Sequence, residues 1–256
     1  MDVLKIELEG LTTSFRYPHF LVGRQPSFTM PPPSTIYGHI ASALGDYPDP
    51  ESFRFAYAFT HAGKVDDFEH TYMIAVDRTK KRGWEHPSNI SASLNPTLRQ
   101  MFFRPQLTLY LATPNLEHWQ AAFRAPRYPV ALGRSQDLAS YRSVRGVSLE
   151  RSNTGYVENT LLPWSYRPYV RLGEGVLMPR LIDPSNRENV TWARYVTLEH
   201  RIFRPHEGET LEASLTLHKP EAEVWTDPQS PEVRGYRRAL VWHSLTGSDN
   251  EVLDAP

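Results

Sequence analysis

The chain has 256 residues, of which 40% are hydrophobic and 22% are charged, a composition typical of globular proteins that bury a substantial core. It contains no cysteine, which excludes disulfides and thiolate chemistry and favours an intracellular location. The N-terminus lacks the apolar core of a signal peptide, and no apolar run approaches membrane-spanning length. We therefore expect a soluble, cytoplasmic protein that has no membrane partner.

The net charge of −1 conceals a basic middle. Between Arg78 and Arg145 the chain carries 11 Lys/Arg against 3 Asp/Glu, a net of +8, while the remainder carries a net of −9. A basic segment within a neutral protein predicts a surface that faces a polyanion. Solvated basic faces are common as well, so this pattern alone does not identify a partner.

A strand and a loop open the chain. Residues 3–9 alternate apolar and polar side chains, which predicts a half-buried strand. The loop over residues 10–29 mixes arginines, among them Arg24, with aromatic residues. This mixture suits phosphate contact and base stacking, and it suits packing beneath a loop equally well.

A short helix is predicted directly after Pro31-Pro32-Pro33. The prolines force an extended approach, Ser34 or Thr35 can cap the helix through its side chain, and Gly45 is a natural stop. A helix start beside hydroxyl groups can bind a phosphate. An ordinary capped structural helix has the same sequence features.

The predicted helix has one apolar face, because Ile36, Ile40 and Leu44 recur every four residues. On its other sides, Gly38 and the small residues 41–43 are expected to let a neighbouring backbone lie close.

Two further strands are expected over residues 53–60 and 67–76. In the first, an aromatic residue stands at every second position, which is typical of core packing and also resembles the base-stacking platform of RNA-binding sheets; core is favoured. Strand, helix, strand and return strand in this order are the opening of a ferredoxin-like or RNA-recognition-motif fold.

The densest basic segment, residues 78–86, is followed by residues 87–96, which show no periodicity. A long irregular excursion inside a compact domain is typical of a binding loop or a solvated one. Lysines and arginines here can neutralise phosphates, and Trp84 offers a surface for stacking.

Another strand is predicted over residues 106–112, a second helix from Asn115 to before Pro126, and a short strand with a glycine turn over 128–137. Gly133-Arg134-Ser135 can present a guanidinium, a hydroxyl and backbone N–H groups to a phosphate, or it is simply a surface turn. We expect residues 151–256 to form an extension, with a strand over 195–205 and an alternating segment over 211–217.

Short motifs of metal, nucleotide and nucleophile chemistry are missing from the sequence. There is no His-Glu-x-x-His, no metal-ligand spacing of histidines, no Walker loop and no dinucleotide fingerprint. Residues 133–137 fail the Gly-x-Ser-x-Gly elbow at the last position. We expect no cofactor. A ribonuclease that uses only general acid–base groups remains open, because Tyr, His and Lys can cleave RNA without a short motif.

These segments together resemble the Cas-five family of CRISPR-associated proteins, subunits of type I Cascade complexes in the RAMP superfamily. The likeness rests on residues 31–45 after an N-terminal strand, on 95–108, on 128–137 and on 195–205. It covers the first 145 residues well and the rest loosely, and it looks most like the type I-B branch.

The resemblance implies an α+β fold. A ferredoxin-like or RNA-recognition-motif domain (βαββαβ) would occupy residues 1–150, with a β-hairpin thumb inserted at about 78–104. A mostly β or irregular C-terminal extension, residues 151–256, would pack on this domain or on a partner subunit.

The family also implies a function, the binding of the 5′ handle of CRISPR RNA. Its partners would be the backbone and large subunits of Cascade and, indirectly, target DNA. The residues expected to bind RNA lie near the handle, on the thumb and at its base: Arg24, Ser34, Thr35, Tyr37, His39, Lys80, Lys81, Arg82, Trp84, Arg104, Arg134 and Ser135.

Two other functions stay open. One branch of the family cleaves CRISPR RNA with tyrosine, lysine and histidine, for which Tyr37 with His39 or His118 are candidates. No lysine accompanies a histidine in the expected region, since His218-Lys219 lies far along the chain, so binding is favoured over catalysis. The third possibility is a protein-interaction scaffold whose basic middle meets an acidic partner.

Overall fold

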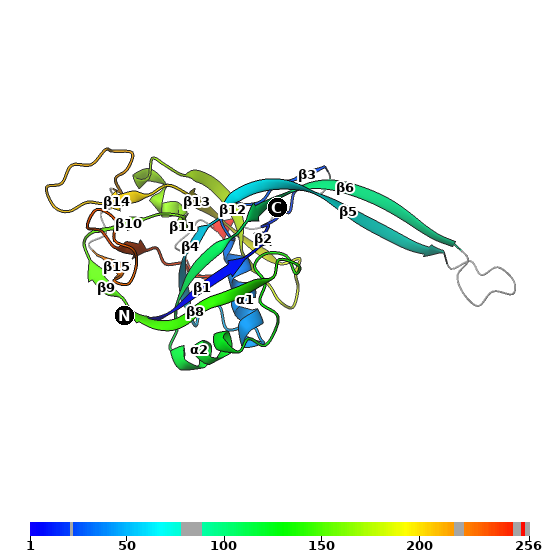
Figure 1. Ribbon diagram of the computed structural model, residues 1–256, viewed down its shortest axis with the longest axis horizontal. Helices are drawn as coiled ribbons and strands as arrows, with labels where there is room; N and C mark the ends of the chain where they lie inside the picture. The colour runs from blue at the N-terminus through cyan, green and yellow to red at the C-terminus, as the bar shows by residue number, and fades with distance from the viewer. Residues whose placement is uncertain (21–22, 78–88, 218–222, 248–251, 254–256) are drawn as a thin grey trace.

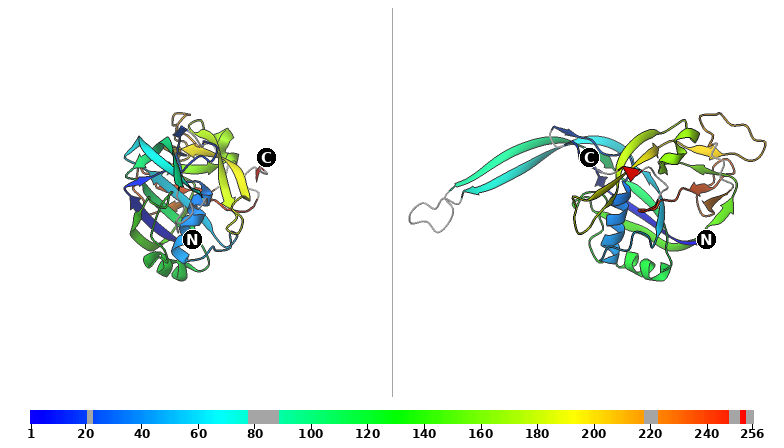
Figure 2. Two further views of the ribbon diagram at one scale, coloured as in Figure 1. Left: turned by 90° about the vertical axis from the view of Figure 1, so that its right-hand side faces the viewer. Right: turned by 180° about the vertical axis from the view of Figure 1, so that it is seen from behind.

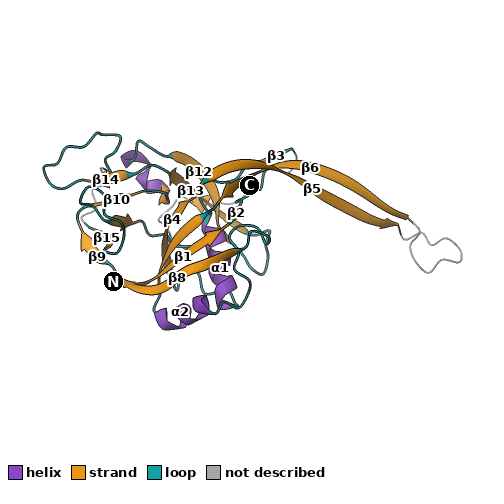
Figure 3. Ribbon diagram, in the orientation of Figure 1, coloured by secondary structure: helices purple, strands orange, loops and turns teal. Residues whose placement is uncertain are grey.

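The computed structural model describes residues 1–20, 23–77, 89–217, 223–247 and 252–253. A body built from several sheets carries one long hairpin that projects far from it (Figure 1). The view from behind shows the same projection from the other side (Figure 2). Strands dominate and the α-helices gather on one side of the body (Figure 3). The α+β class expected from the sequence is confirmed.

A four-stranded antiparallel sheet forms the centre of the body, with the strand order β4-β7-β1-β8. The strands predicted over 3–9, 53–60 and 106–112 and both predicted helices are confirmed, whereas the fourth strand, β8, was not predicted. The four strands carry helices after the first and third strands in chain order. Their bounds are β1 Asp2–Gly10, α1 Pro33–Leu44, β4 Arg54–Thr60, β7 Gln106–Ala112, α2 Leu116–Arg124 and β8 Ala139–Ser148.

Both faces of this sheet are covered near its centre. Leu4 and Ile6 of β1 belong to the same buried cluster as Ile36 and Ile40 of α1, because alternate residues of a strand point to one face. The aromatic row from Phe53 to Phe59 is at most 3% exposed. The row is therefore core, as favoured from the sequence, and nucleobases have no access to it.

The start of α1 differs from the prediction. Pro32 is the N-cap and the cap has no side-chain hydrogen bond, so neither Ser34 nor Thr35 caps the helix. Pro33 is the first helical residue, a position that proline fits because its fixed φ suits a helix start and its missing N–H is not needed there. Ser34 and Thr35 follow as the second and third helical residues, in the first turn. The predicted stop is confirmed, since Gly45 is left-handed at φ 89° and its N–H bonds to the Ala41 carbonyl at 2.8 Å.

The projecting hairpin pairs β5 (Gly63–Asp77) with β6 (Asn89–Phe103) in an unbroken register of antiparallel partners. Two expectations fail here. Residues 67–76 form a strand, but it is not a return strand of the central sheet, because β7 takes that place. Of the segment expected to be irregular, the described residues 89–96 belong to β6, and residues 87–88 lie outside the described residues. The hairpin also begins at Gly63, well before residue 78.

Short strands flank only the base of the hairpin. β2 (Thr12–Thr13) pairs with Phe103 and Phe102, and β3 (Arg24–Gln25) pairs with Leu98 and Arg99. Farther out, β6 has no described neighbour except β5. Directly opposite residues of an antiparallel pair share a face, and one face of the hairpin exposes a set of large apolar side chains from its base outward: Phe68, Tyr72, Ile74, Leu94 and Leu98.

The C-terminal part forms two further sheets, with the orders β14-β10-β16-β15-β9 and β11-β13-β12, the second joined by β17. The bounds are β9 Glu150–Ser152, β10 Gly155–Val157, β11 Thr160–Pro163, the 3₁₀ helix η1 Trp164–Tyr169, β12 Glu174–Ile182, β13 Val190–Leu198, β14 Ile202–Arg204, β15 Val224–Asp227, β16 Arg238–Leu240 and β17 Val252–Leu253.

Three further strand predictions, two of them in the C-terminal part, need correction. The expected strand over 195–205 is two strands in different sheets, because the chain turns between β13 and β14. The alternating segment 211–217 contributes one isolated bridge, Phe203 to Thr216, and segment 128–137 contributes one, Ala131 to Leu138. Alternation alone does not supply the neighbouring strand that a segment needs. The expected division near residue 150 stays a prediction.

A buried ion pair joins the central sheet to the C-terminal strands. The Lys5 ammonium on β1 lies 2.6 Å from the carboxylate of Asp227 on β15, and the Tyr110 hydroxyl on β7 donates to the same oxygen at 2.7 Å. The Lys5 and Asp227 side chains are 5% and 0% exposed. Burial of Asp227 acts to raise its pKa, but the hydrogen bonds from Lys5 and Tyr110 outweigh this effect, so the pKa is lowered.

Candidate functional site

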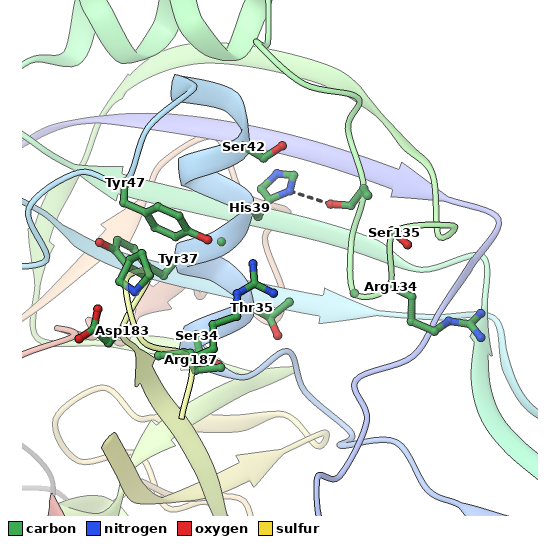
Figure 4. Close-up of a pocket in the computed structure, with 15 residues that line it drawn as sticks. Ser34, Thr35, Tyr37, His39, Ser42, Tyr47, Arg134, Ser135, Asp183 and Arg187 are labelled. Atoms are coloured by element: carbon green, nitrogen blue, oxygen red, sulfur yellow. Dashed lines mark hydrogen bonds between the residues drawn. The ribbon is translucent and has the colours of Figure 1, made fainter. Parts of the chain in front are cut away.

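A pocket of about 380 Å³ opens beside the first half of α1. Figure 4 shows its walls: α1 on one side, a turn of residues 133–135 on another, and the loop that joins β12 to β13 on a third. Six of the residues predicted to bind RNA line this one pocket, although they come from two separate segments of the chain, residues 34–39 and 134–135: Ser34, Thr35, Tyr37, His39, Arg134 and Ser135.

The first turn of α1 supplies the hydroxyl groups of Ser34 and Thr35 to the pocket. One turn later, Gly38 also lines it, and a Cβ built there would meet nothing within 4 Å. The expectation that Gly38 permits close approach of a neighbouring backbone is therefore wrong. The missing side chain instead leaves space in the pocket.

Tyr37 is held in place by its own hydroxyl, which donates to the Pro48 carbonyl at 2.8 Å. The side chain is buried at 3% exposure and packs on Tyr47, with ring centroids 5.3 Å apart. Burial, followed by the neighbouring Tyr47 and two aspartates, raises the pKa of Tyr37. The hydroxyl is thus a protonated donor whose partner is an internal carbonyl.

His39 is buried, and both of its ring nitrogens have partners. Nδ1 lies 2.9 Å from the Ala131 carbonyl and Nε2 lies 3.0 Å from the Tyr141 hydroxyl, and Figure 4 marks the first of these contacts. Burial lowers the pKa of His39, with the Ala131 contact acting in the opposite direction. We assign the neutral tautomer in which Nδ1–H donates to Ala131 and Nε2 accepts from Tyr141.

The turn at Gly133 brings Arg134 and Ser135 to the pocket. Gly133 has φ +95°, and a Cβ there would lie 2.6 Å from the Thr13 hydroxyl, so both conformation and space demand glycine. The predicted glycine turn is confirmed. This tight turn sets Ser135 at the rim of the pocket.

The guanidinium of Arg134 points away from α1 (Figure 4) and is held by carboxylates. Its Nε and Nη2 each donate to Asp137 at 2.8 Å, and Nη1 donates to Glu69 of the hairpin. The hydrogen bond with Asp137 is the main cause that raises the pKa of Arg134. Phosphate contact by Arg134 stays a prediction, and it would compete with these two carboxylates.

Sequence reasoning missed the third wall of the pocket. Asp183 and Arg187 lie on the loop between β12 and β13. The sequence predicts only a C-terminal extension in this part of the chain. The Asp183 carboxylate accepts hydrogen bonds from the hydroxyl and N–H of Ser185, which shape the loop and lower the pKa of Asp183.

Arg187 is exposed and reaches toward the first turn of α1 (Figure 4). Within the described part of the chain it forms no ion pair. A cation with no carboxylate partner among the described residues therefore lines the same pocket as the hydroxyls of Ser34 and Thr35. No local signal in the sequence links a loop residue at 187 to a helix at 34.

Two predicted residues lie outside the pocket. Arg24, on β3 at the base of the hairpin, pairs with Asp66 at 3.0 Å, and both side chains are exposed. Arg104 forms the turn between β6 and β7 with φ 49° and lines a separate cavity of about 550 Å³ with Leu11 and Leu138.

The four predicted thumb residues lie outside the described residues: Lys80, Lys81, Arg82 and Trp84. His118, a nuclease candidate, is exposed on α2 and does not line the pocket.

The described residues lack two other functional features. They contain no cluster of three or more His, Asp or Glu arranged to hold a metal ion. They also contain no helix with the length and apolar character needed to cross a membrane.

Comparison with known families identifies the chain. A family model described as "CRISPR-associated protein (Cas_Cas5)" matches residues 3–191. The chain belongs to this Cas5 family. The resemblance found in the sequence is thereby confirmed at the family level, and the matched residues include all of the pocket. A search of the curated proteins finds no match for this Cas5 chain.

Solved structures similar to this Cas5 protein include CRISPR proteins. A chain of a "CRISPR RNA-guided surveillance complex" is 20% identical, with a TM-score of 0.41, covering 54% of this chain and 60% of that one. This protein thus spans 60% of that chain's length. A CRISPR protein from Archaeoglobus fulgidus is 10% identical, with a TM-score of 0.44, covering 94% of this chain and 98% of that one.

Proposed function

We propose that this Cas5 protein is a non-catalytic, CRISPR RNA-binding subunit of a type I Cascade surveillance complex, and that it holds the 5′ handle of the guide RNA. The observation that carries the proposal is the meeting of Ser34 and Thr35 with Ser135 and Arg187 in one pocket. Its volume of about 380 Å³ is at the lower end of the range of small-ligand sites, which suits one nucleotide of a bound strand.

The chemistry of the pocket suits a sugar–phosphate backbone. Hydroxyls of Ser34 and Thr35 can donate to phosphate oxygens, and the Arg187 guanidinium supplies a charge and a fork of donors for the same group. The N-terminal turn of α1 adds the positive end of the helix dipole. Tyr47, 43% exposed at the rim, offers a ring face on which a base can stack.

The wider role that we propose follows the family. The hairpin, together with the cationic residues that follow β5 in the sequence, would run along the guide RNA, and the body would contact the backbone and large subunits and, through them, target DNA. We propose a cytoplasmic location in a prokaryote and the type I-B branch. The strand order of the central sheet, with helices after its first and third strands, supports a ferredoxin-like fold.

Binding fits the pocket better than RNA cleavage. A general acid or base needs a proton to exchange with the substrate and a pKa near the working pH. The Tyr37 hydroxyl already donates to a carbonyl, and His39 is a neutral ring with both nitrogens engaged. Neither side chain presents a free group to a bound strand.

The handle proposal is tested in the assembled complex with an RNA that carries the repeat-derived 5′ handle. We expect Arg187→Gln to weaken binding about 10-fold and to reduce the slope of log K against log salt by about 1, since one phosphate contact is lost. Ser34→Ala combined with Thr35→Ala removes the neutral donors, so it should weaken binding and leave the salt slope unchanged.

Arg142→Gln is the matched control, because Arg142 is an exposed arginine on β8 that pairs with Glu9, and neither residue lines the pocket. Equal losses for Arg187→Gln and Arg142→Gln would contradict the pocket as the handle site. Handle-dependent RNA cleavage in EDTA that is lost with His39→Ala would favour the ribonuclease. Assembly without any bound RNA would favour the protein scaffold.

A further inference from the structure

An ion-pair network connects the hairpin to the wall of the pocket. Glu69, on β5, accepts from Arg99 Nε of β6 at 2.5 Å and from Nη1 of Arg134. Arg134 in turn donates to Asp137 through Nε, Nη2 and its backbone N–H. Since Arg134 and its neighbour Ser135 line the pocket, the network runs without interruption from the hairpin to the proposed handle site.

This network is shielded from water, unlike the other ion pairs of the hairpin. The side chains of Arg134, Arg99 and Glu69 are 15%, 11% and 23% exposed, and that of Asp137 is fully buried. Within the described residues 64–74 of β5, Glu69 is the one residue that is not exposed. Shielded, multiply bonded ion pairs hold their geometry better than exposed ones.

Its position gives the network a mechanical role. The flanking strand β3 ends its pairing with β6 at Leu98 and Arg99, and Glu69 stands opposite Thr97, the next residue outward. Beyond that point the hairpin is a two-stranded ribbon, and an isolated two-stranded ribbon is only marginally stable by itself. The eight residues that follow Glu69, up to Asp77, extend about 26 Å, so a tilt of roughly 10° at Glu69 moves their far end by about 4 Å.

We propose that Glu69 is a positioning residue that locks the hairpin to the Gly133–Asp137 turn, so that hairpin and pocket form one surface of fixed geometry. Arg134 acts in this lock through its two carboxylate partners. The use of that geometry for guide RNA rests on the proposed function, whereas the lock itself does not.

The absence of cysteine permits a direct test by pulsed electron paramagnetic resonance. Spin labels are attached at Met73→Cys on the exposed side of β5 and at Glu117→Cys on the exposed surface of α2. The label distance then reports the angle of the hairpin. We expect one narrow distribution without further substitution, and a distribution at least twice as wide with Glu69→Gln.

Asp66→Asn is the matched control. It removes one carboxylate charge from the same strand, but the pair that it breaks, with Arg24, is exposed. We expect an unchanged distance distribution for this variant. Glu69→Asp retains the charge, but its shorter side chain reaches only one guanidinium, so we expect a distance distribution of intermediate width. If circular dichroism shows that Glu69→Gln impairs folding, Glu69→Asp takes its place as the test variant.

A narrow distribution in both Glu69→Gln and Glu69→Asp would overturn the lock. Equal broadening with Asp66→Asn would overturn the lock too, because an exposed ion pair would then fix the angle of the hairpin as well as the buried network does. If the distribution widens with Glu69→Gln as expected and the unsubstituted protein does not bind handle RNA, the lock stands and the proposed function fails. When both hold, Glu69→Gln should weaken binding of handle RNA about 5-fold in the assembled complex.

Discussion

The body and the hairpin use the same alternating strand pattern in opposite ways. In the body, Leu4 and Ile6 of β1 are at most 1% exposed, because helices cover their face of the sheet. In the outer hairpin, Phe68 and Tyr72 stand on one face of the ribbon at 55% and 65% exposure. The body is therefore stabilised by its own packing, whereas the hairpin depends on the contacts at its base and on a binding partner. An exposed apolar face of this kind is typical of an interaction surface.

The largest expected contrast between the two regions concerns a single carboxylate. We expect Asp227→Asn to lower the free energy of unfolding by about 3–5 kcal/mol, because it leaves Lys5 buried without its charge partner. Asp66→Asn breaks an exposed pair of the hairpin and should cost less than about 1 kcal/mol. Urea unfolding of the two variants measures both effects. Similar values for the two would contradict the comparison.

The next contrast concerns acid stability. His243 is buried against Phe55, and its Nε2 lies 2.9 Å from the Leu161 carbonyl. Burial lowers the pKa of His243 to about 4, and the charge of Arg180 acts in the same direction. The unfolded chain, with an ordinary histidine pKa, therefore binds this proton more readily, so stability falls as the pH drops from about 6.5 to about 4.

This one group should contribute a loss of about 3 kcal/mol over that pH window. Unfolding measured across the window should show a shallower pH dependence in His243→Gln than in the unsubstituted protein. His70, exposed on β5 of the hairpin, gives the matched control His70→Gln, which should leave the pH dependence unchanged. An unchanged slope in His243→Gln would contradict the assignment.

The smallest expected effect is in the apolar face of the hairpin. Phe68→Ala removes a side chain that is 55% exposed, so the free energy of unfolding should change by no more than about 0.5 kcal/mol. Phe59→Ala, at 1% exposure in the core, should cost about 3–5 kcal/mol. Measurements by urea unfolding that showed a large loss for Phe68→Ala would mean that the hairpin packs on the body.

The sequence predicted those elements whose pattern is local. Residues 3–9, 53–60 and 106–112 alternate and form strands of the central sheet, and Ile36 and Ile40 mark the buried face of α1. Burial of the aromatic row in β4 was also foreseen, since a core position is the commoner fate of such residues.

The errors have a common physical cause, which is that strand partners are chosen by distant contacts. Residues 67–76 pair with β6 instead of joining the central sheet, and residues 89–96, which were expected to be irregular, form part of that partner strand. For the same reason, Arg187 could not be placed beside Ser34 and Thr35 from sequence alone, and the carboxylates that hold Arg134 were not foreseen. The cap was wrong because the helix already begins at Pro33, so the N-cap is Pro32 and not Ser34 or Thr35.

The central claim is that the 5′ handle of a guide RNA lies in the pocket beside α1. A cryo-electron microscopy map of the assembled complex with guide RNA tests it most directly. The claim predicts density for a handle nucleotide between the first turn of α1 and Arg187, with a phosphate against Ser34 or Thr35. A map in which the handle is ordered elsewhere, and this pocket faces solvent, would contradict it.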